Sequence, residues 1–264
     1  MRLFIKKLNL NIKMSLLIIK IVAVTGVLGR EQEVEGEKML IDLHMHEMTY
    51  SKDSFLKLSQ IVEIAKEKGL DGISITDHDS MGLKDYAAEY SEKTGFPIFT
   101  GIEYYSLQGD IVAFGIEDYP RERIPAQEFI DLVKAQGGIC FAAHPFRNNG
   151  RGLGEHLCEV KGLDGLEVLN GSTSAAACRK AAKYAGRQGL HTLGASDCHV
   201  PEKVGVCATW FPGEIRTLQE LLAAFEKGGM KPAMYRRVLT GFLKYRKGVK
   251  SERLHKKYFI KNVL

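Results

Sequence analysis

Residues 39–46 read MLIDLHMH, an apolar run that ends in two histidines separated by one residue. A short apolar run of this kind is typical of a buried β-strand. Side chains two positions apart on an extended chain point to the same side, so two imidazoles at a strand end can bind one ion. The stretch therefore predicts a strand with metal-binding side chains, His44 and His46, at its carboxyl end.

The same order, an apolar run followed by a metal-binding side chain, recurs along the chain. The runs lie at residues 72–76, 98–102, 138–143 and 191–195. The side chains that follow them are Asp77 and His78, Glu103, His144, and Asp197 and His199. With His44 and His46, this set takes five of the eight histidines, whereas histidines placed for packing would fall mostly on helices and loops. The pattern favours one metal centre built from distant segments.

Further patterns complete an alternation of strands and helices. Apolar residues at helical spacing predict helices at residues 58–66, 83–93, 126–136, 174–188 and 218–227. Apolar runs predict additional strands at residues 111–115, 164–169 and 204–210. Such alternation predicts a largely parallel sheet with helices outside it. With about seven or eight strands and no glycine-rich phosphate-binding turn after the first, a closed barrel is favoured over a doubly wound sheet. A barrel would gather the strand-end residues on one face.

The composition is that of a globular protein in a reducing compartment. The 264 residues suffice for one large domain or two small ones, and the net charge is +5. The five cysteines are odd in number and show no CxxC pair, which argues against a disulfide framework or a zinc ribbon. Cys198, between two candidate ligands, is interpreted as a small packing residue. We expect a cytoplasmic protein.

The first 38 residues fit three interpretations. Residues 1–13 are basic, and an apolar run at residues 15–29 is interrupted by Lys20. The run resembles a short signal or anchor, but it is shorter than the roughly 20 residues of a membrane span, and no small-residue cleavage site follows. Alternatively, the working protein begins near Met39 and residues 1–38 are an upstream extension. Firm membrane association is not expected, and anchoring or export is the alternative to a cytoplasmic location.

The last segment, residues 230–264, is a basic tail. Its lysines and arginines far outnumber a single acid, Glu252. Such a tail can hold a nucleic-acid backbone, or it can dock on the main domain through aromatic anchors such as Phe242 and Tyr245. We favour docking. The predicted organisation is an extension at 1–38, one main domain at 39–229 and the tail.

Six stretches together resemble the PHP (polymerase and histidinol phosphatase) family. They are DLHMH at 42–46, TDHD at 76–79, GIE at 101–103, AHP at 143–145, LEVLNG at 166–171 and SDCH at 196–199. The resemblance covers residues 39–229 and implies a metal-dependent hydrolase domain there. It also implies an α/β fold, a distorted (β/α)7 barrel in a single domain, and a site for two or three divalent ions of manganese, zinc or iron.

The resemblance further implies three sets of metal ligands. The first set is His44, His46, Glu103 and Asp197. In the second set, Glu103 bridges to an ion that is also held by His144 and one more side chain. The third set is Asp53, His78 and His199.

Two of these positions depart from the family pattern. Asp53 lies nine residues after His44, one or two further than is usual in the family. Asp110 stands where the family often has a histidine. Its carboxylate either completes the second set or only closes the turn after Gly109.

Mixed histidine and carboxylate ligation predicts hydrolysis of a phosphate ester. Two neighbouring ions would lower the pKa of a bound water and neutralise the phosphate oxygens. As catalytic residues, Glu103 would bridge the ions and Asp77 would orient an imidazole from behind. Arg147 would grip a second phosphate or the leaving group, unless it is only a solvated surface arginine.

The favoured function is hydrolysis of a small phosphate monoester, a nucleotide or a sugar phosphate, by a metal-activated hydroxide. The alternatives are a histidinol-phosphate phosphatase, a nuclease-like phosphodiesterase whose basic tail holds nucleic acid, and a non-catalytic module stabilised by metal. The complete ligand set disfavours the last. A small phosphorylated molecule is therefore the expected partner, and nucleic acid is the less favoured one.

Overall fold

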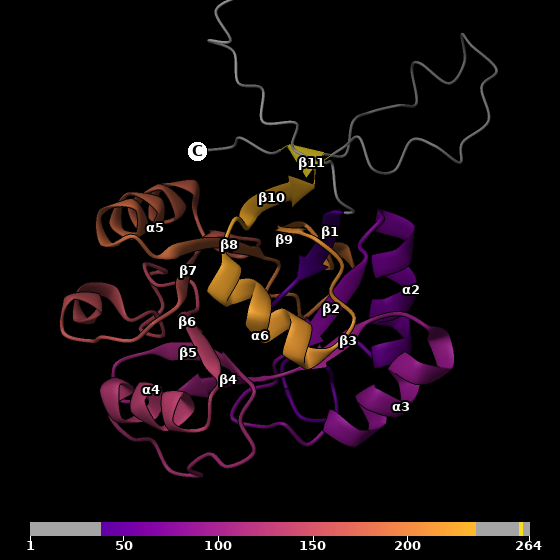
Figure 1. Ribbon diagram of the computed structural model, residues 1–264, viewed down its shortest axis with the longest axis horizontal. Helices are drawn as coiled ribbons and strands as arrows, with labels where there is room; N and C mark the ends of the chain where they lie inside the picture. Colours follow the sequence, from indigo (N-terminus) through magenta and orange to yellow (C-terminus); the bar gives the residue numbers. More distant parts are fainter. Residues whose placement is uncertain (1–37, 236–258, 261–264) are drawn as a thin grey trace, which may run out of the picture. The chain divides into compact units, whose positions relative to one another are not determined.

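The computed structural model describes residues 38–235 and 259–260 of the chain (Figure 1). The predictions for residues 1–37 and for most of the basic tail lie outside the described residues. Within the described part, no helix is long and apolar enough to cross a membrane.

The first of two mixed sheets has six strands. Its order is β11-β10-β9-β1-β2-β3. In that order the bounds are Phe259–Ile260, Lys231–Tyr235, Cys207–Pro212, Lys38–Asp42, Gly72–Ile75 and Ile98–Thr100. β1, β2 and β3 run parallel, whereas β9 is antiparallel to both β1 and β10. The predicted domain boundary at residue 229 stays a prediction, and β10, which follows it, pairs with β9.

The second sheet has five strands in the order β4-β5-β6-β7-β8. Their bounds are Ile102–Tyr105, Asp110–Phe114, Ile139–Ala142, Gly165–Asn170 and His191–Ala195. β5 is antiparallel to β4 and to β6, and β6, β7 and β8 are parallel.

Helices pack against each sheet (Figure 1), and each sheet forms a hydrophobic core with its own helices. A third core contains residues of both sheets. α2 (Leu58–Lys68) and α3 (Lys84–Thr94) pack on the first sheet, and α4 (Ala126–Ala135) and α5 (Ala175–Gln188) pack on the second. α6 (Leu218–Lys227) adds Leu221 and Phe225 to a core that also contains Ile41 of β1 and Phe141 of β6. Because this core draws on both sheets, it holds their inner faces together. Short 3₁₀ turns span Gly154–Cys158 and Pro201–Lys203.

The expected closed (β/α)7 barrel is wrong, because the described strands form two separate sheets. Gly101 splits the predicted strand 98–102 into β3 and β4. A Cβ at Gly101 would lie 2.5 Å from the backbone oxygen of Ala113, so only glycine fits this bend. Where β8 of the second sheet lies beside β9 of the first, the two strands are joined through a side chain and not through a ladder of backbone hydrogen bonds. The Thr209 hydroxyl accepts from Gly194 N at 2.9 Å and donates to Gly194 O at 2.8 Å.

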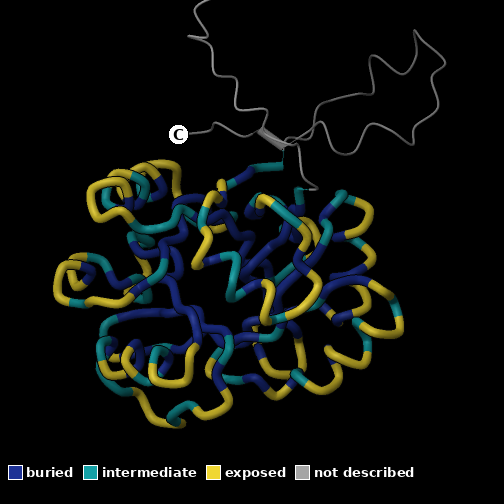
Figure 2. The backbone as a smooth tube through the Cα atoms, in the orientation of Figure 1, coloured by how far each residue is buried: buried dark blue, intermediate teal, exposed yellow. Residues whose placement is uncertain are grey.

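The structure confirms most predicted elements within a few residues. All five predicted helices are present, and the helix ends follow local signals. Thr217 and Glu220 form a capping box at the start of α6, and α2 stops at Gly69, whose φ of 79° suits glycine. The predicted strand 204–210 begins later, at Cys207, because the chain still turns through Gly205, whose φ is 65°. Figure 2 shows that the inner strands are buried and that exposed residues lie mainly on helices and connecting loops; β10 is largely half-buried.

Candidate metal centre

The structure brings the predicted ligands together at the ends of the strands. His44 and His46 follow β1, His78 follows β2, Glu103 lies within β4, and Asp110 begins β5. The remaining ligands follow β6 and β8; they are His144, Asp197 and His199. Backbone hydrogen bonds fix the junction between β2 and β4, since Glu103 N donates to Asp77 O at 3.2 Å and Asp79 N donates to Glu103 O at 3.0 Å.

The centre is buried on one side and open on the other. Its inner side chains are at most 2% exposed; they are His44, His46, Glu103, His144 and Asp197. On the open side, His78 and His199 are about a quarter exposed, and Asp53 is 62% exposed. A substrate would therefore approach from the side of Asp53.

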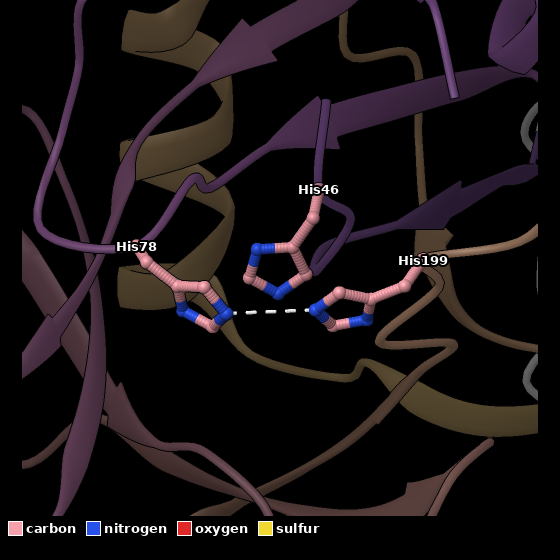
Figure 3. A group of neighbouring side chains, drawn as sticks. All are labelled: His46, His78 and His199. Atoms are coloured by element: carbon pink, nitrogen blue, oxygen red, sulfur yellow. Dashed lines mark hydrogen bonds between the residues drawn. The ribbon is translucent and has the colours of Figure 1, made fainter. Parts of the chain in front are cut away.

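Three groups of side chains place their ligand atoms within 4.8 Å of one another. The groups are His44, His46 and Asp197; His44, Glu103 and His144; and His46, His78 and His199. Figure 3 shows the last group, in which three rings from separate segments gather around one point. His78 and His199 face each other there, with their Nε2 atoms 3.5 Å apart.

The hydrogen bonds of two inner histidines determine which ring nitrogens carry protons. His44 Nδ1 lies 2.7 Å from Glu167 Oε1, so it donates to that carboxylate. His46 Nδ1 lies 3.1 Å from Ser51 Oγ, which gives its own proton to Asp77 Oδ1 at 2.7 Å. His46 must therefore donate to Ser51. Both rings therefore turn Nε2 to the centre. His46 presents a lone pair there, and His44 does so once it loses its second proton, which Glu167 and Glu103 hold by raising the pKa of His44 well above its usual value against the effect of burial.

These lone pairs meet other acceptor atoms. His44 Nε2 and His46 Nε2 are only 3.0 Å apart. Glu103 Oε1 lies 3.2 Å from the first, and Asp197 Oδ1 lies 3.3 Å from the second. Without metal, the second proton of His44 lies among these acceptors; a divalent cation that displaces this proton finds nitrogen and carboxylate donors arranged around one point. The residues present therefore fit a divalent metal ion.

Glu103 spans the inner and outer parts of the centre. Its Oε1 lies 2.9 Å from His144 Nε2, and its Oε2 lies 2.7 Å from His78 Nδ1. Oε2 nevertheless makes no hydrogen bond of acceptable geometry among the described residues. A carboxylate with one oxygen toward each part is suited to hold two ions at once.

Electrostatics keep the carboxylates ionised. Burial alone would raise the pKa of Glu103, but the positive charge of His44 and the close ring nitrogens of His144 and His78 hold it well below its usual range. The pKa of Asp197 is low for similar reasons. Burial lowers the pKa of His46 to about 4, which leaves its ring neutral. Ionised carboxylates and neutral imidazoles are the forms that bind divalent metals.

Comparison with known proteins assigns the fold to a family. A model of the PHP-associated segment matches residues 175–229. An uncharacterised protein of Methanocaldococcus jannaschii is 30% identical over 142 residues, which span 50% of this chain and 82% of that protein. The chain belongs to the PHP family.

Solved structures share the PHP fold at low sequence identity. A two-domain protein of Bacteroides vulgatus, containing a predicted PHP-like metal-dependent phosphoesterase, matches with a TM-score of 0.62 and 23% identity. The match covers 75% of this chain and 65% of that one, so this chain spans less than two thirds of the relative. A lesion-specific endonuclease of Pyrococcus furiosus matches with a TM-score of 0.54 and 16% identity, over 85% of this chain and 69% of that one.

Two of the predicted catalytic residues contact protein groups of the PHP centre. Asp77 Oδ1 accepts from Ser51 and from Glu47 N, each at 2.7 Å, so it acts on His46 only through Ser51. Arg147 binds Asp197 and also donates to Asn170 Oδ1 at 2.7 Å. The predicted role of Arg147 with a substrate phosphate stays a prediction.

Asp110 lies at the PHP centre, but its carboxylate already has a partner. Its oxygens accept from Arg151 Nε at 2.7 Å and Arg151 Nη2 at 2.9 Å. Oδ2 is also 3.6 Å from His144 Nε2. Burial and the charge of Glu103 raise the pKa of Asp110 to about 7, so its ionised form depends on a nearby cation. Asp110 also follows the turn at Gly109, and both interpretations of its position match the geometry.

The backbone is strained at two ligands of the PHP centre. His144 has a φ of 29° and Asp197 a φ of 51°, in the left-handed region that non-glycine residues rarely adopt. Each such residue costs on the order of 1–3 kcal/mol and persists where the surroundings fix it. Asp197 N donates to His44 O at 2.9 Å, which ties this strained turn to the other ligand loop.

Glu167 is a residue of the PHP centre that the sequence patterns did not single out as functional. Its Oε1 accepts from His44 Nδ1, and its Oε2 accepts from His144 N and Asn170 Nδ2, both at 2.8 Å. It is 1% exposed. A lone carboxylate inside the apolar run of β7 was the signal that could have identified it. Glu167 therefore orients one ligand ring and anchors the backbone of another.

Replacing Glu167 with glutamine should weaken metal binding by roughly 10–100-fold. Glutamine has one acceptor oxygen, so it cannot serve both His44 and the other two donors. Competition with a fluorescent chelator would measure the change. Glu155→Gln, at a solvent-exposed glutamate, is the matched control. Equal metal affinity in Glu167→Gln and the control would contradict the role.

Proposed function

We propose that this chain is a metal-dependent phosphoesterase that hydrolyses a small phosphate monoester, such as a nucleotide or a sugar phosphate. The supporting observation is the convergence of imidazole lone pairs and ionised carboxylates on one point that is open to solvent on one side. Such a donor set binds hard or borderline divalent ions and leaves an approach for a substrate.

Each part of the chain has a defined task in this proposal. When bound, the ions supply a hydroxide near neutral pH and neutralise phosphate oxygens. His44, His46 and Asp197 hold the inner position, and Glu103 connects it to the outer one. Ser51, held by Asp77, keeps the His46 ring in its metal-binding tautomer.

The rim of the open side supports a compact substrate. The loop that carries Asp53 exposes Met48, Tyr50 and Phe55, at 44%, 41% and 72%. Phe55 is fixed beside the centre, because its N donates to His199 O at 2.9 Å. An apolar rim suits the organic part of a small ester, whereas a nucleic-acid backbone is held mainly by lysines and arginines.

A nuclease-like phosphodiesterase is the second candidate. It is favoured by the similarity to the P. furiosus lesion-specific endonuclease and by the basic tail, most of which lies outside the described residues. If the tail holds nucleic acid, oligonucleotide affinity should fall with salt, by roughly 0.7 log units per log unit of salt for each neutralised phosphate. Deleting residues 236–264 should then remove that dependence.

A substrate panel distinguishes the candidates. Metal-free protein would be reloaded with manganese, zinc or iron and offered mononucleotides, nucleoside bisphosphates, sugar phosphates, histidinol phosphate and short oligonucleotides. We expect release of phosphate from small monoesters and no cleavage of oligonucleotides. Preferential oligonucleotide cleavage would establish the second candidate instead, and no hydrolysis of any ester under any metal would refute the proposed function.

A further inference from the structure

Arg151 is built into the metal centre from the loop that follows His144. Its guanidinium binds both oxygens of Asp110, a residue that is fully buried. Nη2 also lies 3.5 Å from His78 Nδ1 and 3.8 Å from Glu103 Oε2. A fixed positive charge therefore lies beside the carboxylates that would otherwise attract a metal ion.

The surrounding structure holds Arg151 in this place. Asp110 N donates to Arg151 O at 2.7 Å, so the two residues are joined through backbone as well as side chains. The guanidinium lies 4.3 Å from the centre of the Tyr105 ring. Tyr105 N in turn donates to Asp79 Oδ1 at 2.8 Å. The arginine is thus positioned by groups that belong to three separate segments.

The ligand atoms do not suffice for three equally well-held ions. His44 and His46 each belong to two of the three groups, yet one imidazole nitrogen binds one ion at a time. If both serve the ion of Asp197, the third group keeps His78 and His199 and can add Asp53, whereas the second group keeps only Glu103 and His144. Asp110 is the nearby carboxylate that could complete that group, but Arg151 occupies both its oxygens.

The charges lead to the same conclusion. Five carboxylates contact the imidazole rings of the centre; they are Asp53, Glu103, Asp110, Glu167 and Asp197. Arg147 and Arg151 supply two positive charges against them. Counted over these seven groups alone, two divalent ions leave about one excess positive charge, whereas a third leaves about three in a largely buried place.

We propose that the positive charge of Arg151 neutralises Asp110 in place of a third metal ion, so that the centre holds about two ions tightly. The inference rests on the proposed metal centre but concerns the number of ions, not the reaction. It makes Arg151 a positioning residue that sets metal occupancy. Removing its charge frees Asp110 to join His144 and Glu103 as a ligand.

Metal counting tests the inference directly. Full-length protein would be stripped with a chelator, reloaded with excess Mn²⁺, passed through gel filtration and subjected to elemental analysis. We expect about two ions per chain in the wild type and in Arg151→Lys, and about three in Arg151→Met. Asp110→Asn added to Arg151→Met should return the count to about two. Arg121→Met, at an exposed arginine, is the matched control.

Each of these metal counts either supports the inference or overturns it. About three ions in the wild type, or no gain in a folded Arg151→Met variant, would overturn the inference. Arg151→Gln gives the same expectation if the methionine variant does not fold by circular dichroism. Ester hydrolysis measured on the same samples separates the two claims, since the expected counts without any hydrolysis would refute the proposed function alone.

Discussion

Glu103→Ala should reduce phosphate release by about 10³-fold or more, because the side chain reaches both parts of the centre at once. Removing a single well-placed polar group from an active site costs roughly 10²–10³-fold, and loss of a bridging carboxylate disturbs two ions. His144→Ala should also lose activity but keep more of it, since its Nε2 faces only one side of Glu103. Steady-state phosphate release at saturating manganese measures both.

Metal analysis of the same variants makes this comparison interpretable. Glu122→Ala, at an exposed glutamate, should match the wild type. The bridging assignment fails if Glu103→Ala and His144→Ala show similar residual turnover while both retain their full metal content.

Metal removal should lower the melting temperature by roughly 10 °C. Ions at a thousand times their Kd stabilise the folded chain by about 4 kcal/mol, and each kcal/mol corresponds to about 2–4 °C for a chain of this size. Without ions, the buried Glu103 and Asp197 keep their charges against His44, His78 and two arginines, without the positive charges of the metal. Thermal denaturation with and without EDTA gives the shift.

The stabilisation should also depend on pH with a defined sign. Metal ligation needs neutral imidazoles, so the shift should be full only well above pH 8 and shrink as the pH falls through the pKa of His78, which Glu103 raises to about 8 against the effect of burial. His44→Ala should show a much smaller shift at every pH. An EDTA effect that is equally large in this variant would place the stabilising metal elsewhere.

Hydrophobic periodicity predicted the elements because it is a local property of the sequence. The gathering of the candidate ligands was predictable for a related reason, since these residues follow apolar runs in the sequence, however the strands are arranged into sheets. Barrel closure was not predictable, because it depends on pairing between distant strands. The bend at Gly101 and the contact of Thr209 with Gly194 leave two sheets where one closed barrel was expected.

Sequence patterns also could not predict which residues Arg147, Arg151 and Glu167 contact. Arg147 meets Asp197 and Arg151 meets Asp110, pairs that lie 50 and 41 residues apart in sequence. No local sequence pattern predicts contacts between residues so far apart, and from the sequence alone either arginine could equally have been exposed to solvent. Glu167 is recognisable in the sequence as a carboxylate within an apolar strand. Its contact with His44, however, joins residues 123 positions apart and is seen only in the folded structure.

Anomalous diffraction from a manganese-loaded crystal tests the metal centre most directly. The account predicts strong peaks within about 2–2.3 Å of the Nε2 atoms of His44 and His46 and of those of His78 and His199. Glu103 should have an oxygen toward each part of the centre. Peaks elsewhere on the chain, or none at these atoms in protein saturated with manganese, would contradict it.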